Sequence, residues 1–266
     1  MAVGVSALVS NQWRFKRVLY ASAKAELRKR YAGTLLSSLW PVLYPLLFLG
    51  AYLFVWIVVV GVRYPGTGRL DYVMFLFGGL VPFLYLMDTM TAGAAVIKQN
   101  IQLVKSVILP VDLIITRTVL VGLVGHLVGV ALLIALGAVN GSLTWRVGLL
   151  PIVVAIQVLW LVGLAWIVAP LGLIVPDVGH LVSLASILLM FVSPIAFKPE
   201  MVPGRYRVLL QLNPITYMVD AYRWVTIGPS AASVNALFLF GALAAAAFVI
   251  GGAFCWRFKS FAVDFE

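Results

Sequence analysis

Aromatic side chains recur at every fourth position in one long apolar stretch, which carries no charge until Arg63. These residues are Trp40, Tyr44, Phe48, Tyr52 and Trp56. Residues at positions i and i+4 lie one above another on a helix, so the rings form a ridge that drifts about 40° per step. Their flat faces could stack on a passing ligand. Aromatic rings at this spacing also serve helix packing, and tryptophans at helix ends anchor them at the membrane interface.

Ionisable residues inside or between other apolar stretches are the next candidates for chemistry. Asp88, Arg117 and His126 lie within such stretches. Buried charge is costly in a membrane and is usually paired, so an Asp88–Arg117 pair is possible, although the sequence does not fix it. Asp177 and His180 share a short turn, within reach of each other, which makes a metal or proton site conceivable.

Catalytic and nucleotide-binding motifs are missing from the sequence. It contains no GxxxxGK[ST] loop, no HExxH pair and no nucleophile elbow. The nine acidic residues are scattered, and the single Cys255 allows neither an internal disulfide nor a cysteine-based metal site. We therefore expect a protein that is not an enzyme and binds no cofactor itself. Any ATP-driven work would need another chain.

The composition is that of a membrane protein that crosses the bilayer several times. Of its 266 residues, 63% are hydrophobic and 11% are charged, and the mean hydropathy is +1.08. Soluble chains carry roughly 25% charged residues. The net charge of +10 would suggest nucleic acid in a soluble protein, but here the cations flank apolar segments and set their orientation.

Six apolar segments approach the roughly 20 residues that a spanning helix needs. They are 41–62, 71–93, 113–138, 147–175, 180–197 and 232–256. Seven Lys and Arg residues precede the first segment, which favours a cytoplasmic N-terminus. Six spans would return the C-terminus to the cytoplasm. In the third segment, Gly122, Gly125 and Gly129 permit close helix packing.

Three segments outside the spans have patterns of their own. Residues 11–31 form a basic amphipathic pattern typical of an interface helix, and the same residues fit a topology signal or a docking element for a partner. Residues 94–112 predict a short cytoplasmic helix that ends at Pro110, or a plain surface connection. The segment 198–230 is rich in Pro and Gly and predicts two short helices, 205–211 and 215–226, folded back into the outer interface.

Short motifs in a fixed order resemble one family. They are Arg30-Tyr31, Gly33, Leu36, Leu39-Trp40 and Pro41; then Asn100, Leu103, Val104, Lys105 and Leu109-Pro110; then Pro176-Asp177, His180, Ser193-Pro194, Asn213-Pro214 and Ala221-Tyr222-Arg223. In this order the chain resembles the permease subunit of type-2 ABC transporters, in particular the polysaccharide exporters for O-antigen, teichoic acid and capsule. Each motif is weak alone, but together they extend over almost the whole chain.

The resemblance implies a fold and a set of partners. It implies an all-α polytopic membrane protein, a single permease domain over 1–266, with six transmembrane helices, an N-terminal amphipathic interface helix and short periplasmic re-entrant gate helices between helices five and six. The partners would be an ABC ATPase subunit, which would hold ATP and Mg²⁺, a second copy of the permease, a lipid-linked glycan and membrane lipids, but no nucleic acid. The location would be the cytoplasmic (inner) membrane.

Roles for particular residues follow from the resemblance and from the aromatic ridge. The resemblance places the ATPase-coupling residues in the 94–112 region, at Asn100, Leu103, Val104, Lys105 and Pro110. It places the periplasmic gate at Asn213, Pro214, Tyr217 and Arg223. Sugar rings present C–H faces that stack on aromatics, so we expect a transport path along Trp40, Tyr44, Phe48, Tyr52, Trp56, Ser183, Ser186 and Met190.

The function expected from the sequence is that of a permease subunit in an ATP-driven ABC exporter. Its cargo would be a lipid-linked polysaccharide, O-antigen-like or teichoic-acid-like, moved across the cytoplasmic membrane. A type-2 ABC exporter of a drug or lipid fits the same short outer loops. A membrane-embedded enzyme acting on a lipid-linked substrate is a remote alternative, because such enzymes need clustered catalytic acids.

Overall fold

The computed structural model describes residues 2–31, 39–61, 69–105, 110–228 and 232–263. Within them the chain forms helices and no strand. Five helical segments are long and apolar enough to cross a bilayer. The expectation of an all-α, multi-pass membrane protein is therefore confirmed.

The helical elements follow one another along the chain with short connections between them. In order, they are α1 Ala2–Arg14, α2 Lys16–Tyr31, α3 Trp40–Leu53, η1 Phe54–Val59, α4 Arg69–Gln99, α5 Ile101–Lys105, α6 Val111–Val139, η2 Trp145–Leu149, α7 Leu150–Ile174, α8 Val178–Val192, η3 Pro199–Met201, η4 Gly204–Tyr206, α9 Arg207–Leu212, α10 Pro214–Thr226 and α11 Val234–Val263. The element η1 is a π-helix that continues α3, and η2, η3 and η4 are 3-10 turns.

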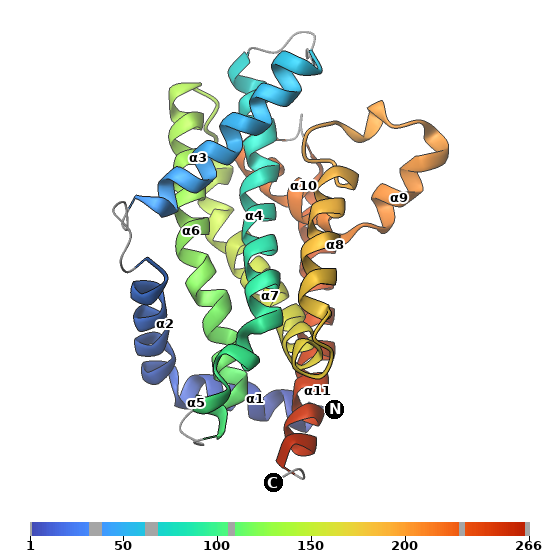
Figure 1. The fold of residues 1–266 in the computed structure, drawn as a ribbon. Coiled ribbons are helices and arrows are strands. Elements are labelled where there is room, and N and C mark those ends of the chain that lie inside the picture. The colour runs from blue at the N-terminus through green and yellow to red at the C-terminus, as the bar shows by residue number, and fades with distance from the viewer. Residues whose placement is uncertain (1, 32–38, 62–68, 106–109, 229–231, 264–266) are drawn as a thin grey trace.

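Helix α4 is the centre of the bundle. It packs against α6, α7, α8 and α10 and also contacts α3. Figure 1 shows α3 crossing α4 diagonally, with α6 on one side of α4 and α8 on the other. Helix α1 lies across one end of the bundle, and α5 and both ends of the chain lie at that same end. Since α4 contacts most other helices, its side chains form much of the core.

Helix α8 is shorter than the sequence pattern suggests. Six spans were expected, but among the described residues α8 is an apolar helix of only 15 residues, too short to count with the other five. The expected segment ran on to residue 197, whereas the helix stops before Ser193-Pro194. Pro194 lacks the N–H that another helical turn needs. The length of α8 alone therefore does not identify it as a membrane span.

The N-terminal segment differs from the single helix expected over 11–31. The structure has two helices, α1 and α2, which part at Phe15, and α1 begins well before residue 11. Leu8 is fully buried, and Gly4 lies so close to Trp256 of α11 that a methyl group would clash with it. The sequence prediction missed this early start because it depends on contacts with the other end of the chain.

The two other patterned segments are helical over part of their length. In the 94–112 region α4 continues to Gln99 and α5 is a separate short helix, while 106–109 lie outside the described residues. The helices expected at 205–211 and 215–226 are present as α9 and α10. The linker containing Gly33, Ser37 and Ser38 also lies outside the described residues, as does Pro229.

Glycines set the closest helix approaches. A side chain at Gly122 or Gly129 would press on Tyr85 or Val81 of α4, which confirms the close packing expected of α6. At Gly125, between them, a methyl group would meet no atom within 4 Å. An even closer approach joins α7 to α11, where Gly163 and Gly251 leave no room for a methyl group.

Candidate transport site

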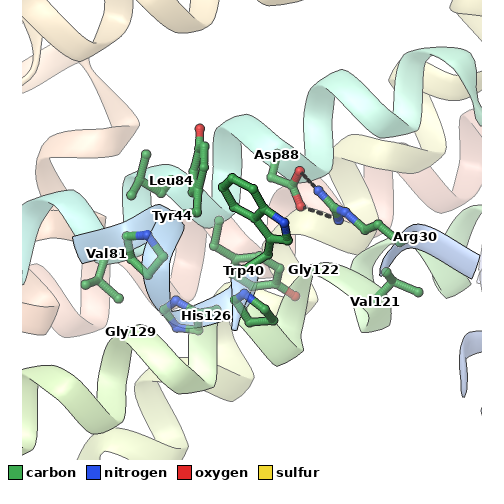
Figure 2. A pocket seen from close by; sticks show the side chains of 14 residues that line it. Arg30, Trp40, Tyr44, Val81, Leu84, Asp88, Val121, Gly122, His126 and Gly129 are labelled. Carbon is green, nitrogen blue, oxygen red and sulfur yellow. Dashed lines mark hydrogen bonds and ion pairs between the residues drawn. The ribbon is translucent and has the colours of Figure 1, made fainter. Parts of the chain in front are cut away.

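A cavity of about 420 Å³ lies between α3, α4 and α6. Its polar and aromatic lining residues are Arg30, Trp40, Tyr44, Tyr85, Asp88 and His126. Figure 2 shows Trp40 and Tyr44 from α3, Asp88 from α4 facing Arg30 from α2, and His126 from α6. Side chains from four helices, α2, α3, α4 and α6, thus meet at one polar and aromatic pocket.

The aromatic ridge of α3 is a continuous ladder in the structure. The ring centroids of Tyr44 and Phe48 are 6.1 Å apart, those of Phe48 and Tyr52 are 6.3 Å apart, and those of Tyr52 and Trp56 are 6.1 Å apart. The rings do not share one environment, however. Trp40 and Tyr44 line the cavity and are exposed, whereas Tyr52 is buried in the helix core. The start of the ladder is therefore its most open part within this chain, while Phe48 and Trp56 are half-buried.

Asp88 forms an ion pair with Arg30. Arg30 Nη1 donates to Asp88 Oδ2 at 2.9 Å, and Nη2 donates to Oδ1, so the pair is bidentate. The Asp88–Arg117 pair that the sequence left open is not formed. Arg117 instead donates to Asn100 Oδ1 at 2.9 Å and lies 3.5 Å from Glu26. Both Asp88 and Arg117 thus have partners other than each other.

A network of buried hydrogen bonds extends from the cavity into the core. His126 Nε2 lies 2.8 Å from the Tyr222 hydroxyl, which donates to Gln157 Oε1 at 2.5 Å. Gln157 Nε2 in turn donates to the carbonyl of Pro82 at 2.8 Å. The His126 ring also stacks on Tyr85, with centroids 4.8 Å apart. This network joins α6, α10, α7 and α4. Sequence reasoning missed it because the residues are far apart in the chain and no local pattern links them.

None of the α8 residues assigned to the transport path lines the cavity between α3, α4 and α6, and one of them, Ser186, lies at a different one. Ser186 lines a mainly apolar cavity of about 500 Å³ that is bounded chiefly by α4, α7, α8 and α11. The hydroxyls of Ser183 and Ser186 donate to carbonyls one turn back in their own helix, and Met190 packs against the core. The two cavities have no lining residue in common. Within one chain the α3 and α8 parts of the expected path are therefore separate.

The residues assigned to ATPase coupling lie at the end of the bundle that holds both chain termini (Figure 1). Asn100 follows α4, and its side-chain amide donates to the Val96 carbonyl at 2.8 Å. Leu103, Val104 and Lys105 are in α5, and Pro110 precedes α6 at its N-cap position. Through Asn100 and Arg117, the start of this segment is hydrogen-bonded to α6.

Asp112 ties the two ends of the chain to α6. It is fully buried, accepts a hydrogen bond from Gln12 of α1 at 3.2 Å, and pairs with Lys259 of α11 at 2.5 Å. The sequence pointed to neither contact, since Gln12 and Lys259 lie 100 and 147 residues from Asp112. The sequence offered one local signal: Asp112 lies in the first turn of α6, where the helix dipole favours negative charge.

The residues assigned to the gate hold α10 in place. Asn213 caps α10 by accepting from the Ile215 N–H at 3.0 Å, and its amide donates to Ser193 at 2.9 Å. Pro214 occupies the first turn, where a missing N–H costs nothing. Tyr217 donates to the Gln211 carbonyl at 2.7 Å. Together these bonds join α8, α9 and α10 into one unit.

Arg223 is fully buried and donates to three carbonyls. Its bonds run to Phe75 at 3.1 Å, Pro194 at 2.7 Å and Ile195 at 2.6 Å, with the guanidinium 3.5 Å above the Phe75 ring. Asp220 lies 4.0 Å away, and burial raises the pKa of its carboxyl to about 6 despite the nearby guanidinium. The gate arginine is thus a structural anchor between α10, α4 and the turn after α8.

Asp177 and His180 flank the start of α8. Asp177 occupies the N-cap position but makes no side-chain cap hydrogen bond. In the described ranges no group of three or more His, Cys, Asp and Glu residues could hold a metal ion. The structure therefore adds no support for the metal site considered from the sequence.

Comparisons with known proteins bear on the identity of the chain. No family model matches it. It is 27% identical over 219 residues to an O-antigen export system permease protein RfbA of Myxococcus xanthus, covering 81% of this chain and 82% of that protein. It is 28% identical over 209 residues to a protein of the same name from Klebsiella pneumoniae, covering 77% and 78%. The resemblance of this chain to the permease subunits of polysaccharide-exporting ABC transporters is thereby confirmed.

Proposed function

We propose that this chain is the permease subunit of an ABC exporter that moves a lipid-linked polysaccharide, O-antigen-like or teichoic-acid-like, across the cytoplasmic membrane. The observation that carries the proposal is the similarity to O-antigen export permeases over more than three quarters of both chains. The chain is a permease, and we assign ATP hydrolysis to a separate subunit. The sequence offers no phosphate-binding loop for it.

We infer six membrane passes, with α8 as the short fifth one. Both chain ends lie at one end of the bundle, which an even number of passes requires (Figure 1). Seven Lys and Arg residues of α1 and α2 precede the first span, and positive charge favours the cytoplasmic side. On this topology α9 and α10 form the periplasmic gate region. An α8 of 15 residues spans about 22 Å, and the turn after it would complete the crossing.

The conduit itself would form between two copies of the permease. Six helices seldom enclose a wide path alone, and the α3 and α8 residues lie at separate cavities in one chain. A second copy could bring the α3 ladder of one chain towards α8 of the other. Aromatic faces would then give a sliding glycan many weak contacts.

Coupling to the ATPase would pass through α5 and the chain ends. Closure of the ATPase would push on α5, which follows Asn100, and Asn100 is bonded to Arg117 of α6. The bonds of Asp112 to α1 and α11 join the same end of α6 to both termini. A push on this end would therefore reach α6 directly and bias the bundle between two arrangements.

The first experiment is co-expression with a candidate ABC ATPase from the same organism, and purification through a tag on this chain. We expect a complex of two permeases and two ATPases that hydrolyses ATP, together with glycan export in cells lacking their own permease. A permease that purifies alone in mild detergent would refute the transporter assignment. An active complex that exports a drug or lipid but no glycan would refute the cargo.

The aromatic path can be tested by changing Tyr44, Phe48 and Tyr52 together to Ala. We expect export to fall at least about fivefold, because sliding contacts worth about 1 kcal/mol or more would be lost. The control changes Leu46, Leu47 and Phe54, exposed residues of the same segment outside the ladder, to Ala. Unchanged export in the aromatic variant, at normal abundance, would exclude the path.

The coupling segment can be tested with Lys105→Glu. We expect normal membrane insertion and weaker recovery of the ATPase in the purified complex, since reversing the charge puts repulsion into a contact surface. Arg205→Glu, at the exposed η4 turn, is the control for charge reversal alone. Full recovery of the complex from the Lys105 variant would contradict the contact.

A further inference from the structure

Arg146 is a cation without a counter-ion in the η2 turn before α7. Its side chain is only partly exposed. Within the part of the chain that the structure describes, it forms no ion pair, and none of its nitrogen atoms makes a hydrogen bond. A partly buried charge is usually paired, because taking it out of water is costly. This arginine therefore favours a ligand that brings a negative charge.

Two indole rings flank the guanidinium of Arg146. Its central carbon lies 5.6 Å from the ring centroid of Trp145 and 5.5 Å from that of Trp224. A cation–π contact is an attraction to the ring face and takes up no N–H bond, so the donors are still unused. Nε is buried, whereas Nη1 and Nη2 are not. Gly228 has no side chain to crowd Nη1, which would lie 3.3 Å from a methyl group there. An acceptor can therefore reach the two terminal nitrogens.

The apolar pattern places Arg146 at the level of the lipid headgroups. Helix α6 starts at the end of the bundle that holds both chain termini, so η2 lies at the opposite end (Figure 1). Val139, the last residue of α6, is 79% exposed, and the chain then becomes polar at Asn140 and Ser142. The apolar α7 begins soon after Arg146. Trp145 is 76% exposed, and tryptophans gather at the membrane interface. The guanidinium thus lies where the phosphates of a bilayer lie.

Two carboxylates at this end of the bundle are already engaged by other groups. Asp71 accepts a hydrogen bond from the Asn140 amide at 2.7 Å. Asp220 lies 4.0 Å from the guanidinium of Arg223. Neither one forms an ion pair with Arg146. At the membrane surface, the anions at hand are then the phosphates of the lipids.

We propose that Arg146 binds the phosphate group of a membrane lipid, with Nη1 and Nη2 donating to two phosphate oxygens beside Trp145 and Trp224. The planar fork of an arginine matches two oxygens of one phosphate. On the proposed topology the lipid belongs to the outer leaflet. The site joins η2 to α10, so a bound lipid fastens the last turn of α10 to the start of α7. It goes beyond the transport function and depends on neither the cargo nor the ATPase.

The test compares two lipids that differ in the phosphate. The probe is dioleoyl phosphatidylglycerol, and the control is dioleoylglycerol, which has the same chains and no phosphate. The full chain, purified in detergent and freed of lipid, is titrated with each, and native mass spectrometry gives the affinity for the first lipid bound. We expect Arg146→Gln to bind phosphatidylglycerol at least about tenfold more weakly than the wild type. Arg205→Gln, which removes another arginine beside an aromatic ring, should bind it as the wild type does.

Four outcomes would overturn the site. They are equal binding of phosphatidylglycerol by the wild type and Arg146→Gln, an equal loss in Arg205→Gln, equal binding of both lipids by the wild type, and displacement of the phospholipid by inorganic phosphate at the same concentration. The last would indicate a site for free anions. The last two need only the wild type, so they hold even if the variant does not fold.

The thermal midpoint without lipid checks the fold of Arg146→Gln. It should stay close to that of the wild type, because the substitution breaks no hydrogen bond or ion pair among the described residues. The assay needs no ATPase and no transport. A chain that binds the phospholipid but forms no ATPase complex therefore refutes the proposed function and leaves this site standing.

Discussion

Two arginines show how differently this bundle is built on its two sides. Arg223 is fully buried between α10, α4 and the turn after α8, and it donates to three backbone carbonyls. Arg30 stands at the cavity beside α3 with a 40% exposed side chain, and it pairs with the carboxylate of Asp88 on another helix. Arg223 thus holds separate backbone segments together, whereas Arg30 pairs with a single side chain, that of Asp88, at the cavity.

The difference teaches which contacts can open. Breaking the Arg223 contact would leave several buried carbonyls without donors, which is costly without water. Separating Arg30 from Asp88 leaves two ions that water can solvate, which costs little. We therefore expect the α4–α10 side to move as one body and the α2–α3 side to be the part that rearranges.

Replacing Arg223 should have the largest effect on stability. Arg223→Leu removes the donors for Phe75, Pro194 and Ile195 and should lower the free energy of unfolding by about 3–5 kcal/mol. The measurement is the thermal midpoint in detergent, together with membrane abundance. Arg205→Leu, on an exposed turn, is the control. Equal thermal midpoints for both variants would show that the buried hydrogen bonds of Arg223 do not stabilise the fold.

Asp220 should give a smaller effect that depends on pH. Its pKa is raised by burial to about 6 from an ordinary value near 4, so the folded state holds the proton longer than the unfolded state. The contribution of Asp220 to stability is therefore fully present below about pH 4 and is lost as the pH rises through about 6, by roughly 3 kcal/mol at most.

Asp220→Asn tests this because it removes the ionisation. The variant should lose most of the difference in thermal midpoint between pH 4 and pH 7 that the wild type shows in this range. The same slope in both proteins would mean that Arg223, already engaged by carbonyls, nevertheless keeps Asp220 ionised. Arg223 would then stabilise a carboxylate, as Arg30 does, and the difference between the two arginines would be smaller.

Changing Arg30 should affect stability least. Arg30→Ala should shift the free energy of unfolding by no more than about 1 kcal/mol, because the pair with Asp88 is partly exposed. The thermal midpoint measures this, and Asp88→Asn should match it. A loss as large as that of Arg223→Leu would show that the cavity side is as fixed as the α10 side.

Patterns local to the sequence predicted much of the fold. The four-residue spacing of Tyr44, Phe48 and Tyr52 predicted a ladder that the structure shows. Asn213-Pro214 marked the start of α10, since an amide followed by proline suits a helix N-terminus. Ser193-Pro194, in contrast, was not taken as a helix end, since the expected span ran past it to residue 197, whereas α8 ends at Val192. Periodicity and breakers act over a few residues, which is why they can be read directly.

Contacts between distant segments could not be read in this way. Arg223 was assigned to the periplasmic gate, and its full burial could not be foreseen, because its partners lie 28, 29 and 148 residues away. His126 has its partner 96 residues further on. A cavity lined from four helices depends on how they cross, and a single sequence carries no direct signal of that.

The bonds of Arg223 also impose an order on how the molecule can be made. The carbonyls of Pro194 and Ile195 emerge from the ribosome 29 and 28 residues before this donor, and that of Phe75 emerges 148 residues before it. Until residue 223 arrives, the turn after α8 lacks the guanidinium that later fixes it to α4. The early helices can enter the bilayer one by one, but their final packing must wait for a side chain from the last fifth of the chain.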